Sequence, residues 1–261
     1  MSSATTVLQS EQAKDRAITL RNRARLSTNK NLLFWYRELY RDQFKEFPNP
    51  VALSILEIGS GTSPLKQFLP NVVTSDVLDL DYLDFVFDCH EIDKFNAIKD
   101  NSLDVITVTN VLHHLKNPIA FLNRAASKLK AGGKMIATEP FFSQLSTVIF
   151  KYLHHEPVDF QISEPELGDL KGPLASASIA LPWLIFFRKP EWRQRLSNNF
   201  DLASLSVRPF STLSYMITGG ISHRLPVPRF LFRMLFPVDL ILSRCFPNLC
   251  AAFFTVTLTR R

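Results

Sequence analysis

The sequence predicts a doubly wound α/β fold, in which helices cover both faces of a mainly parallel sheet. Short runs of apolar and β-branched residues recur along the chain and alternate with segments of helical period. The first run is apolar almost throughout, as expected for a strand that is buried on both faces. A turn with two glycines follows it directly and leads into a short helix. Together these features favour a sheet built from β-α-β units.

The expected elements follow one another in a simple order. The predicted strands are residues 51–59, 72–77, 83–88, 102–111, 134–140, 201–210 and 251–260. The predicted helices are residues 31–46, 118–130, 141–153 and 191–200. The first of these helices ends before Pro48, and Gly132 and Gly133 close the second. The last strand alternates polar and apolar residues, which suggests that the sheet ends in an antiparallel element.

We expect a single domain made of four parts. Residues 1–48 form an N-terminal helical extension with a cationic face, and residues 49–140 form the core that binds a cofactor. Residues 141–200 form a cap that contributes the substrate region. Residues 201–261 supply the terminal strands and carry an apolar insertion at 227–246.

Composition limits the class of protein. Of 261 residues, 46% are hydrophobic and 21% are charged, which excludes a disordered chain and a coiled coil. Three cysteines are too few for a disulfide framework and indicate a reducing compartment. The first residues lack the apolar core of a signal peptide, and no stretch has the length and hydropathy of a membrane span. We expect a cytoplasmic protein, with peripheral attachment to the inner face of the membrane as an open alternative.

The turn Glu57-Ile58-Gly59-Ser60-Gly61 is the most informative segment. Glycines let the backbone approach a ligand, and an acid at the end of the next strand, Asp76, is placed to accept from ribose hydroxyls. A dinucleotide is one candidate, but Pro64 stands where its fingerprint needs a third glycine, and Glu57 would repel a pyrophosphate. A ligand that carries both an ammonium group and an adenosine suits Glu57, Asp76 and a third acid, Asp88.

These residues resemble a known family. The segments LEIGSGT, FVFDCHEI, DVITVTNVLHHLKNP and LKAGGKMIATEP, with Asp76 between the first two, look like class I S-adenosylmethionine-dependent methyltransferases of the type 11 kind. The resemblance covers roughly residues 50–140. It implies a seven-stranded mixed sheet of order 3-2-1-4-5-7-6 with strand 7 antiparallel, and S-adenosyl-L-methionine as the cofactor.

The resemblance also assigns roles to single residues. It implies that Glu57, Gly59, Ser60 and Gly61 hold the methionine part of the cofactor and that Asp76 holds the ribose. Asp88 and Cys89 would meet the adenine, and Asn110 with Val111 would line the side of methyl transfer. Trp35 and Tyr36, in the N-terminal extension, are expected to close over the cofactor.

Methyl transfer to a hydroxyl generally needs a base. Candidates are His113 and His114 after the fourth strand, and His155 in a polar cluster with His154, Glu156 and Asp159. The alternative for each is a structural role, such as capping a loop. The spacing of this cluster fits no zinc signature, so we expect no metal.

Partners are less well defined. Phe230, Leu231, Met234, Leu235, Val238, Ile241 and Leu242 recur near helical period, with Arg229, Arg233 and Arg244 beside them. This stripe is either a core helix or a segment that lies on an anionic membrane, which residues 183–188 would join. No nucleic-acid module is recognisable despite the net charge of +6, so nucleic acid is an unlikely partner.

The acceptor is expected to be a hydroxyl or carboxyl of a small molecule, a glycan or a lipid-linked precursor. Two other functions stay open at this stage. One is a nicotinamide-dependent oxidoreductase, and the other is a non-catalytic protein that binds the cofactor. The sequence does not specify an oligomeric state.

Overall fold

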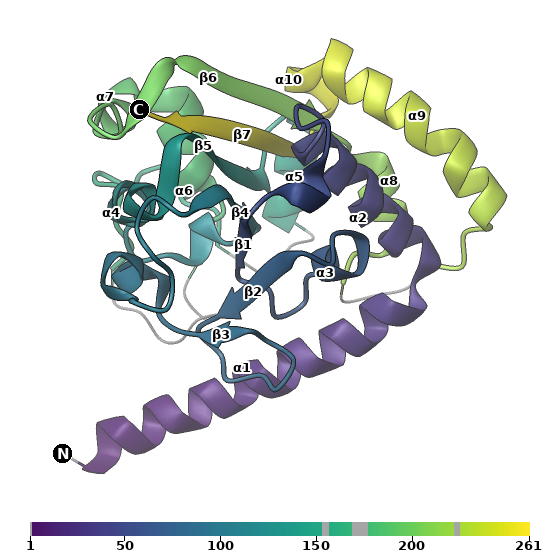
Figure 1. Cartoon of the computed structure of the whole chain (residues 1–261). Coiled ribbons are helices and arrows are strands. Elements are labelled where there is room, and N and C mark those ends of the chain that lie inside the picture. Colours follow the sequence, from purple (N-terminus) through teal and green to yellow (C-terminus); the bar gives the residue numbers. More distant parts are fainter. Residues whose placement is uncertain (1, 153–156, 169–176, 222–224) are drawn as a thin grey trace.

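The centre of the molecule is a seven-stranded sheet (Figure 1). The computed structural model describes residues 2–152, 157–168, 177–221 and 225–261. The strand order is β3-β2-β1-β4-β5-β7-β6. β1 to β5 pair in parallel, whereas β7 runs antiparallel to β5 and β6. The predicted fold class is therefore confirmed, including the strand order and the reversed seventh strand.

The strands lie close to the predicted positions. They are β1 (Ile55–Ile58), β2 (Val72–Asp76), β3 (Phe85–Val86), β4 (Leu103–Thr109), β5 (Leu129–Pro140), β6 (Phe200–Phe210) and β7 (Phe253–Arg260). The helices are α1 (Ser2–Thr28), α2 (Lys30–Gln43), α3 (Leu65–Phe68), α4 (Pro118–Ala125), α5 (Gln144–Tyr152), α6 (Ala180–Trp183), α7 (Pro190–Gln194), α8 (Leu213–Thr218), α9 (Arg229–Cys245) and α10 (Pro247–Cys250). Short 3₁₀ or π turns, named η1 to η5, join several of them.

Several boundaries differ from the prediction; the helix expected over 191–200, for example, is only α7 (Pro190–Gln194). β1 begins only at Ile55, because Pro50–Ala52 form the 3₁₀ turn η1. The helix expected over 118–130 ends at Ala125, and β5 already begins at Leu129. Leu129 already pairs with Leu103 of β4, so strand pairing begins before the two glycines. Gly132 and Gly133 therefore lie within a strand, where Gly132 adopts a φ of 76°.

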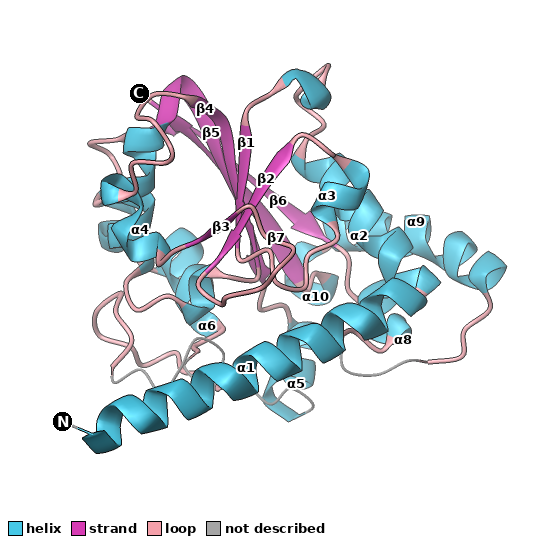
Figure 2. Ribbon diagram, turned by 60° about the horizontal axis from the view of Figure 1, so that its bottom comes forward, coloured by secondary structure: helices cyan, strands magenta, loops and turns pink. Residues whose placement is uncertain are grey.

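The two N-terminal helices occupy different places. α1 crosses the molecule near the carboxyl ends of β2 and β3 (Figure 2). α2 packs into the core, and Asn29 between the helices caps it by accepting from the Leu32 amide at 3.1 Å. Trp35 of α2 is fully buried, and its indole donates to the Ser211 hydroxyl at 2.9 Å. Trp35 is thus a core residue, and the expectation that it closes over the cofactor is wrong.

β7 joins the two faces of the sheet through its alternating side chains. Phe253 packs against Trp35 on one face, whereas Phe254 packs against Phe186 on the other. Residues 184–186 are buried in that second contact. The middle of the segment 183–188 therefore belongs to the core, whereas Phe187 and Arg188 are exposed. That this segment joins an interfacial surface stays a prediction.

α9 runs along the outside of the molecule, where Figure 1 shows it in yellow beside α2 and α8. The apolar stripe of residues 230–242 faces solvent, so it is not the core face of this helix. The buried side chains of α9 are instead Phe232, Phe236, Asp239 and Ser243. Across the described ranges, no helix has both the length and the hydropathy that are needed to cross a bilayer.

Candidate active site

The glycine turn after β1 is built by close backbone packing. Gly59 has a φ of 77°, and a Cβ atom there would lie 2.3 Å from Cγ2 of Val111. A Cβ atom on Gly61 would lie 2.8 Å from Cγ2 of Thr19 and 3.0 Å from Oδ2 of Asp76. Both glycines are therefore required by space, and the first also by its left-handed conformation. α1 contributes Thr19, so the N-terminal extension forms one wall of this turn.

Glu57 is a buried carboxylate at the end of β1. It accepts hydrogen bonds from the hydroxyls of Ser60 at 2.9 Å and Ser63 at 2.5 Å. Ser63 in turn lies 2.8 Å from the hydroxyl of Tyr40 on α2. Burial raises the pKa of Glu57 to about 7, against the hydrogen bonds from the two serines and the charge of Arg23, which lower it. Such a group is well suited to a cationic ligand, which would favour its ionised form.

Asp76 ends β2 beside the same turn. Its Oδ2 accepts from the Gly61 amide at 2.9 Å, and its Oδ1 accepts from the Leu78 amide at 3.1 Å. Burial raises the pKa of Asp76, while these backbone bonds lower it. Each carboxylate oxygen has a second lone pair, so Asp76 retains the capacity to accept from a diol.

Arg23 of α1 holds the far side of the turn. Its guanidinium lies 3.3 Å from the Ser63 carbonyl and 3.9 Å from the centre of the Tyr82 ring. The Tyr82 hydroxyl donates to the Gly61 carbonyl at 2.6 Å. The sequence analysis missed Arg23, Tyr82 and Tyr40, because each comes from a segment without a motif of its own. The cationic face predicted for residues 1–30 was the one available signal for Arg23.

Asp88, Cys89 and His90 follow β3. Their potential ligand atoms lie within 4.8 Å of one another. Asp88 accepts from the His90 amide at 2.9 Å and lies 2.8 Å from Nδ1 of His90, so an Asx turn accounts for the cluster. These hydrogen bonds lower the pKa of Asp88, whereas burial raises the pKa of the Cys89 thiol. Neither residue is a reactive group at neutral pH, and both are available for contacts to a neutral ring.

Asn110 lies directly after β4 in a strained conformation. Its φ is 56°, a value rare for residues other than glycine. Its backbone N–H donates to the Thr138 carbonyl at 2.8 Å. Within the described part of the chain, its buried Oδ1 atom accepts no hydrogen bond. A buried acceptor without a donor costs free energy, so a ligand that donates a hydrogen bond to this atom would be stabilised here.

His113 and Glu139 form a buried pair at the carboxyl ends of β4 and β5. Nδ1 of His113 lies 2.5 Å from Oε2 of Glu139. The other oxygen of Glu139 accepts from the amides of Val111 at 2.9 Å and Leu112 at 2.7 Å. Glu139 therefore holds the whole turn η3 (Leu112–His114), and the His114 ring lies 4.2 Å from that of His113. In the sequence, Glu139 stands at the end of the strand predicted over residues 134–140.

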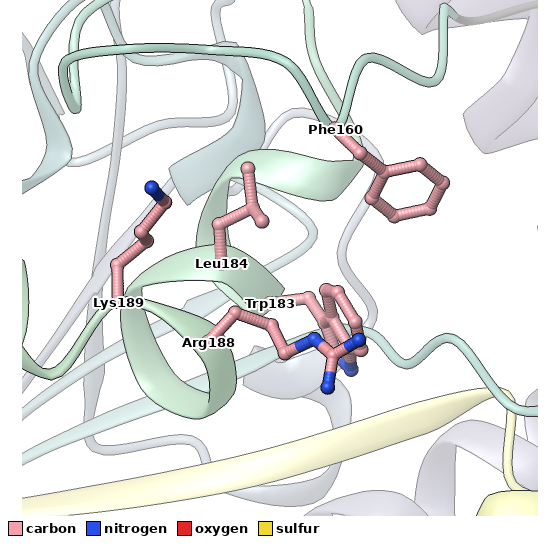
Figure 3. A pocket seen from close by; sticks show the side chains of 5 residues that line it. All are labelled: Phe160, Trp183, Leu184, Arg188 and Lys189. Carbon is pink, nitrogen blue, oxygen red and sulfur yellow. The ribbon is translucent and has the colours of Figure 1, made fainter.

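His155, the third histidine expected to act as a base, lies outside the described residues together with His154 and Glu156. Described residues of the cap line a cavity of about 370 Å³. Figure 3 shows its lining, in which Lys189 and Phe160 lie to either side of Leu184. The Arg188 guanidinium lies 5.1 Å from the centre of the Trp183 ring. Trp183, at the end of α6, lines this cavity, and α6 itself contacts η3.

The structure thus brings two groups of predicted residues together. Around the first turn it assembles Glu57, Gly59, Ser60, Gly61 and Asp76. Asn110 begins the second group, because Val111 beside it contacts both Gly59 and Glu139. His113 and His114 belong to that second group. Tyr36 lies beside the first, where burial, Tyr215 and Glu57 together raise its pKa.

The chain matches a known protein family. A family model described as a methyltransferase domain matches residues 28–199. Among curated proteins, no sequence matches the chain significantly. Among solved structures, the chain is similar to a SAM-dependent methyltransferase from Archaeoglobus fulgidus, at 15% identity over 85% of this chain and 94% of that one, with a TM-score of 0.48.

Two further structures are similar. One is an S-adenosylmethionine-dependent methyltransferase from Mesorhizobium loti, at 13% identity over 85% of this chain and 97% of that one, with a TM-score of 0.44. The other is the N-methyltransferase NodS from Bradyrhizobium japonicum in complex with S-adenosyl-L-homocysteine, at 10% identity over 90% of each chain, also with a TM-score of 0.44.

Proposed function

Because the chain belongs to the methyltransferase domain family, we propose that its site transfers a methyl group from S-adenosylmethionine to a hydroxyl or carboxyl acceptor. The family match covers residues 28–199, which include the glycine turn, the three acids and the histidine turn. The expected class I S-adenosylmethionine-dependent methyltransferase is thereby confirmed as the family. The acceptor and the roles of single residues are our proposals.

The observation that carries the proposal is the buried carboxylate of Glu57 beside a turn without side-chain bulk. With a pKa of about 7, it is protonated in part at neutral pH when it has no cationic partner. An α-ammonium group beside this carboxylate would hold it ionised. A pyrophosphate would meet a carboxylate at this position and be repelled.

Other residues fit the remaining parts of the cofactor. Asp76 would accept from the ribose hydroxyls, and Asp88 with Cys89 would contact the adenine. The buried Oδ1 of Asn110, which accepts nothing from described residues, is suited to a donor on the methionine side. When bound, S-adenosylmethionine supplies a methyl group that is activated by a sulfonium charge.

The histidine turn would position the acceptor. Glu139 fixes the Nδ1 side of His113 and thereby the orientation of its ring. His114, which is partly exposed beside it, is the better placed of the two to contact an acceptor. Arg188 and Lys189 in the nearby cavity favour an acceptor that carries negative charge, such as a carboxyl-bearing small molecule, glycan or lipid-linked precursor.

The test is transfer of labelled methyl groups. The protein is incubated with methyl-labelled S-adenosylmethionine and a cell extract, which is then separated into small molecules, lipids and glycans. We expect label in one fraction, and we expect Asp76→Asn to lose it because the ribose contacts are weakened. Asp79→Asn, at an exposed position of the same loop, is the matched control and should retain it. Absence of label from every fraction, with the protein folded, would contradict the proposal.

A further inference from the structure

α9 is apolar on both of its faces, although it is a surface helix. Phe232 and Phe236 point inward and pack against Phe34 of α2. On the opposite side, Met234 is 67% exposed and Ile241 is 60% exposed. The complete set of large apolar side chains that are exposed along 225–250 is Leu225, Phe230, Leu231, Met234, Leu235, Val238, Ile241, Leu242, Phe246 and Leu249. A helix of this kind in water usually has a polar outer face, so the outer face of α9 indicates a partner.

The exposed charges of the same segment all have one sign. Its basic residues, Arg229, Arg233 and Arg244, are exposed. Its one acid, Asp239, is buried and accepts hydrogen bonds from the amides of Thr212 and Leu213 at the start of α8. Arg244 pairs with Asp42 at 2.7 Å, which leaves Arg229 and Arg233 at the amino end of the helix. The exposed surface of residues 225–250 is therefore apolar with a purely cationic rim.

This charge pattern distinguishes between two occupants. A second copy of the chain, packed about a two-fold axis, would bring this surface against itself and place arginines near arginines without an acid to pair them. An anionic lipid surface offers the opposite arrangement, because its interior takes the apolar side chains and its headgroups take the arginines. Long basic side chains at the edge of such a face reach the headgroups while their stems stay with the apolar residues.

We propose that α9 and α10 form a membrane-binding surface, which lies in the interfacial layer of an anionic bilayer with Met234, Ile241 and their exposed neighbours inserted. Pro237 interrupts the backbone hydrogen bonds within α9 but leaves the exposed apolar side chains on one continuous side. Next to the basic end of α9, Arg37 and Arg233 both lie against the Phe34 ring, at 4.8 Å and 5.5 Å from its centre. Arg37 also pairs with Glu38 at 3.0 Å, so the positive charge at this end comes from Arg229 and Arg233. The proposal goes beyond the proposed methyl transfer and does not depend on it.

The experiment is sedimentation of the full chain with vesicles. Vesicles of phosphatidylcholine with about 30% phosphatidylglycerol are compared with vesicles of phosphatidylcholine alone. We expect the wild type to bind the anionic vesicles, and we expect Arg229→Gln with Arg233→Gln to weaken that binding by about tenfold or more. Met234→Ser with Ile241→Ser should weaken binding to a similar degree. Val51→Ser with Val86→Ser, at exposed apolar positions away from α9, is the matched control and should bind as the wild type does.

Three results would overturn the proposal. The first is a wild type that does not sediment with anionic vesicles. The second is a Met234 and Ile241 variant that binds as strongly as its matched control. The third is a concentration-dependent dimer in vesicle-free solution that this variant dissolves, which would assign the surface to a second copy. Circular dichroism, measured on every variant, verifies that each is folded and keeps this test separate from that of the methyl-transfer site.

Discussion

At the scale of single residues, the site depends on a carboxylate that is poorly solvated. Glu57 is buried, and its described side-chain partners, Ser60 and Ser63, are neutral hydroxyls. Its pKa of about 7, raised by burial from 4.5, means that the folded protein keeps a proton there which the unfolded chain loses. The contribution of Glu57 to stability therefore falls as the pH rises from about 4.5 to about 7. A bound cation would reverse this penalty, so the residue couples ligand binding to protonation.

We expect the affinity for S-adenosylhomocysteine to depend on pH through Glu57. Only the ionised carboxylate binds the ammonium group well, so binding should be roughly tenfold weaker at pH 6 than at pH 8. Isothermal titration calorimetry in buffers of different ionisation enthalpy would measure both the affinity and the uptake or release of protons. Glu57→Gln should bind more weakly at pH 8 and lose the pH dependence. An unchanged pH profile in this variant would show that another group titrates.

The glycine turn permits a prediction with an internal control. Gly59 and Gly132 have nearly the same φ, 77° and 76°, but differ in their surroundings. A Cβ atom on Gly59 would lie 2.3 Å from Val111, whereas nothing lies within 4 Å of one on Gly132. Gly132→Ala should therefore cost only the left-handed conformation, about 1–2 kcal/mol. Gly59→Ala should lower the free energy of unfolding, measured by urea denaturation, by more than this amount. It should also weaken the binding of S-adenosylhomocysteine. Equal losses in the two variants would contradict the close packing at Gly59.

At the scale of elements, the ends of β4 and β5 act as one unit. Glu139 of β5 accepts from two amides of η3 and faces His113, so a strand fixes the conformation of the neighbouring loop. Gln43 of α2 donates to Thr138 of β5 at 2.8 Å and to Thr109 of β4 at 3.1 Å. β5 therefore fixes the conformation of η3, the turn that carries His113 and His114, while α2 holds β4 and β5 together.

We expect Glu139→Gln to lower kcat more than it changes the KM for S-adenosylmethionine. The amide keeps the size of the side chain but removes the charge that orients and activates His113, so the pH profile of kcat should also move. Steady-state kinetics on the acceptor found in the labelling experiment would measure this. The control is Glu166→Gln, an exposed position whose pair with Lys116 spans 3.7 Å. If Glu139→Gln changed only thermal stability and left the pH profile alone, the pair would be purely structural.

The sequence predicted the sheet well because its strands carry their own signals. Apolar β-branched runs and the glycine turn are local patterns, and the resemblance supplied their order. Prediction from the sequence failed where contacts between distant segments decide how a side chain is placed. Trp35 was expected to close over the cofactor, yet Ser211, 176 residues away in the chain, accepts the hydrogen bond of its indole. The residues around Glu57 that come from α1 and α2 were missed for the same reason, since no periodicity specifies which distant turn a helix covers.

The same limit explains the interpretation of α9. Its apolar residues occupy both sides, so periodicity alone did not identify the face that packs on the protein. The contacts of Phe232 and Phe236 with Phe34 determine which face packs inward. They leave the predicted apolar stripe of residues 230–242 exposed to solvent. A helix that is apolar on both faces thus indicates that one face packs on the protein core and that the other binds an external partner.

At the scale of the whole molecule, the cofactor class can be tested without an acceptor. A ligand that binds only the folded state stabilises it by about 2.7 kcal/mol when present at 100 times its Kd. For a chain of this size, such a gain raises the Tm by about 5 to 10 °C. We expect S-adenosylhomocysteine to produce this shift in differential scanning calorimetry and NAD to produce none, because Glu57 opposes a pyrophosphate. Asp76→Asn should reduce the shift, whereas Asp79→Asn should keep it. A shift with NAD alone would favour the oxidoreductase hypothesis, and no shift with either nucleotide would refute the cofactor assignment for this site.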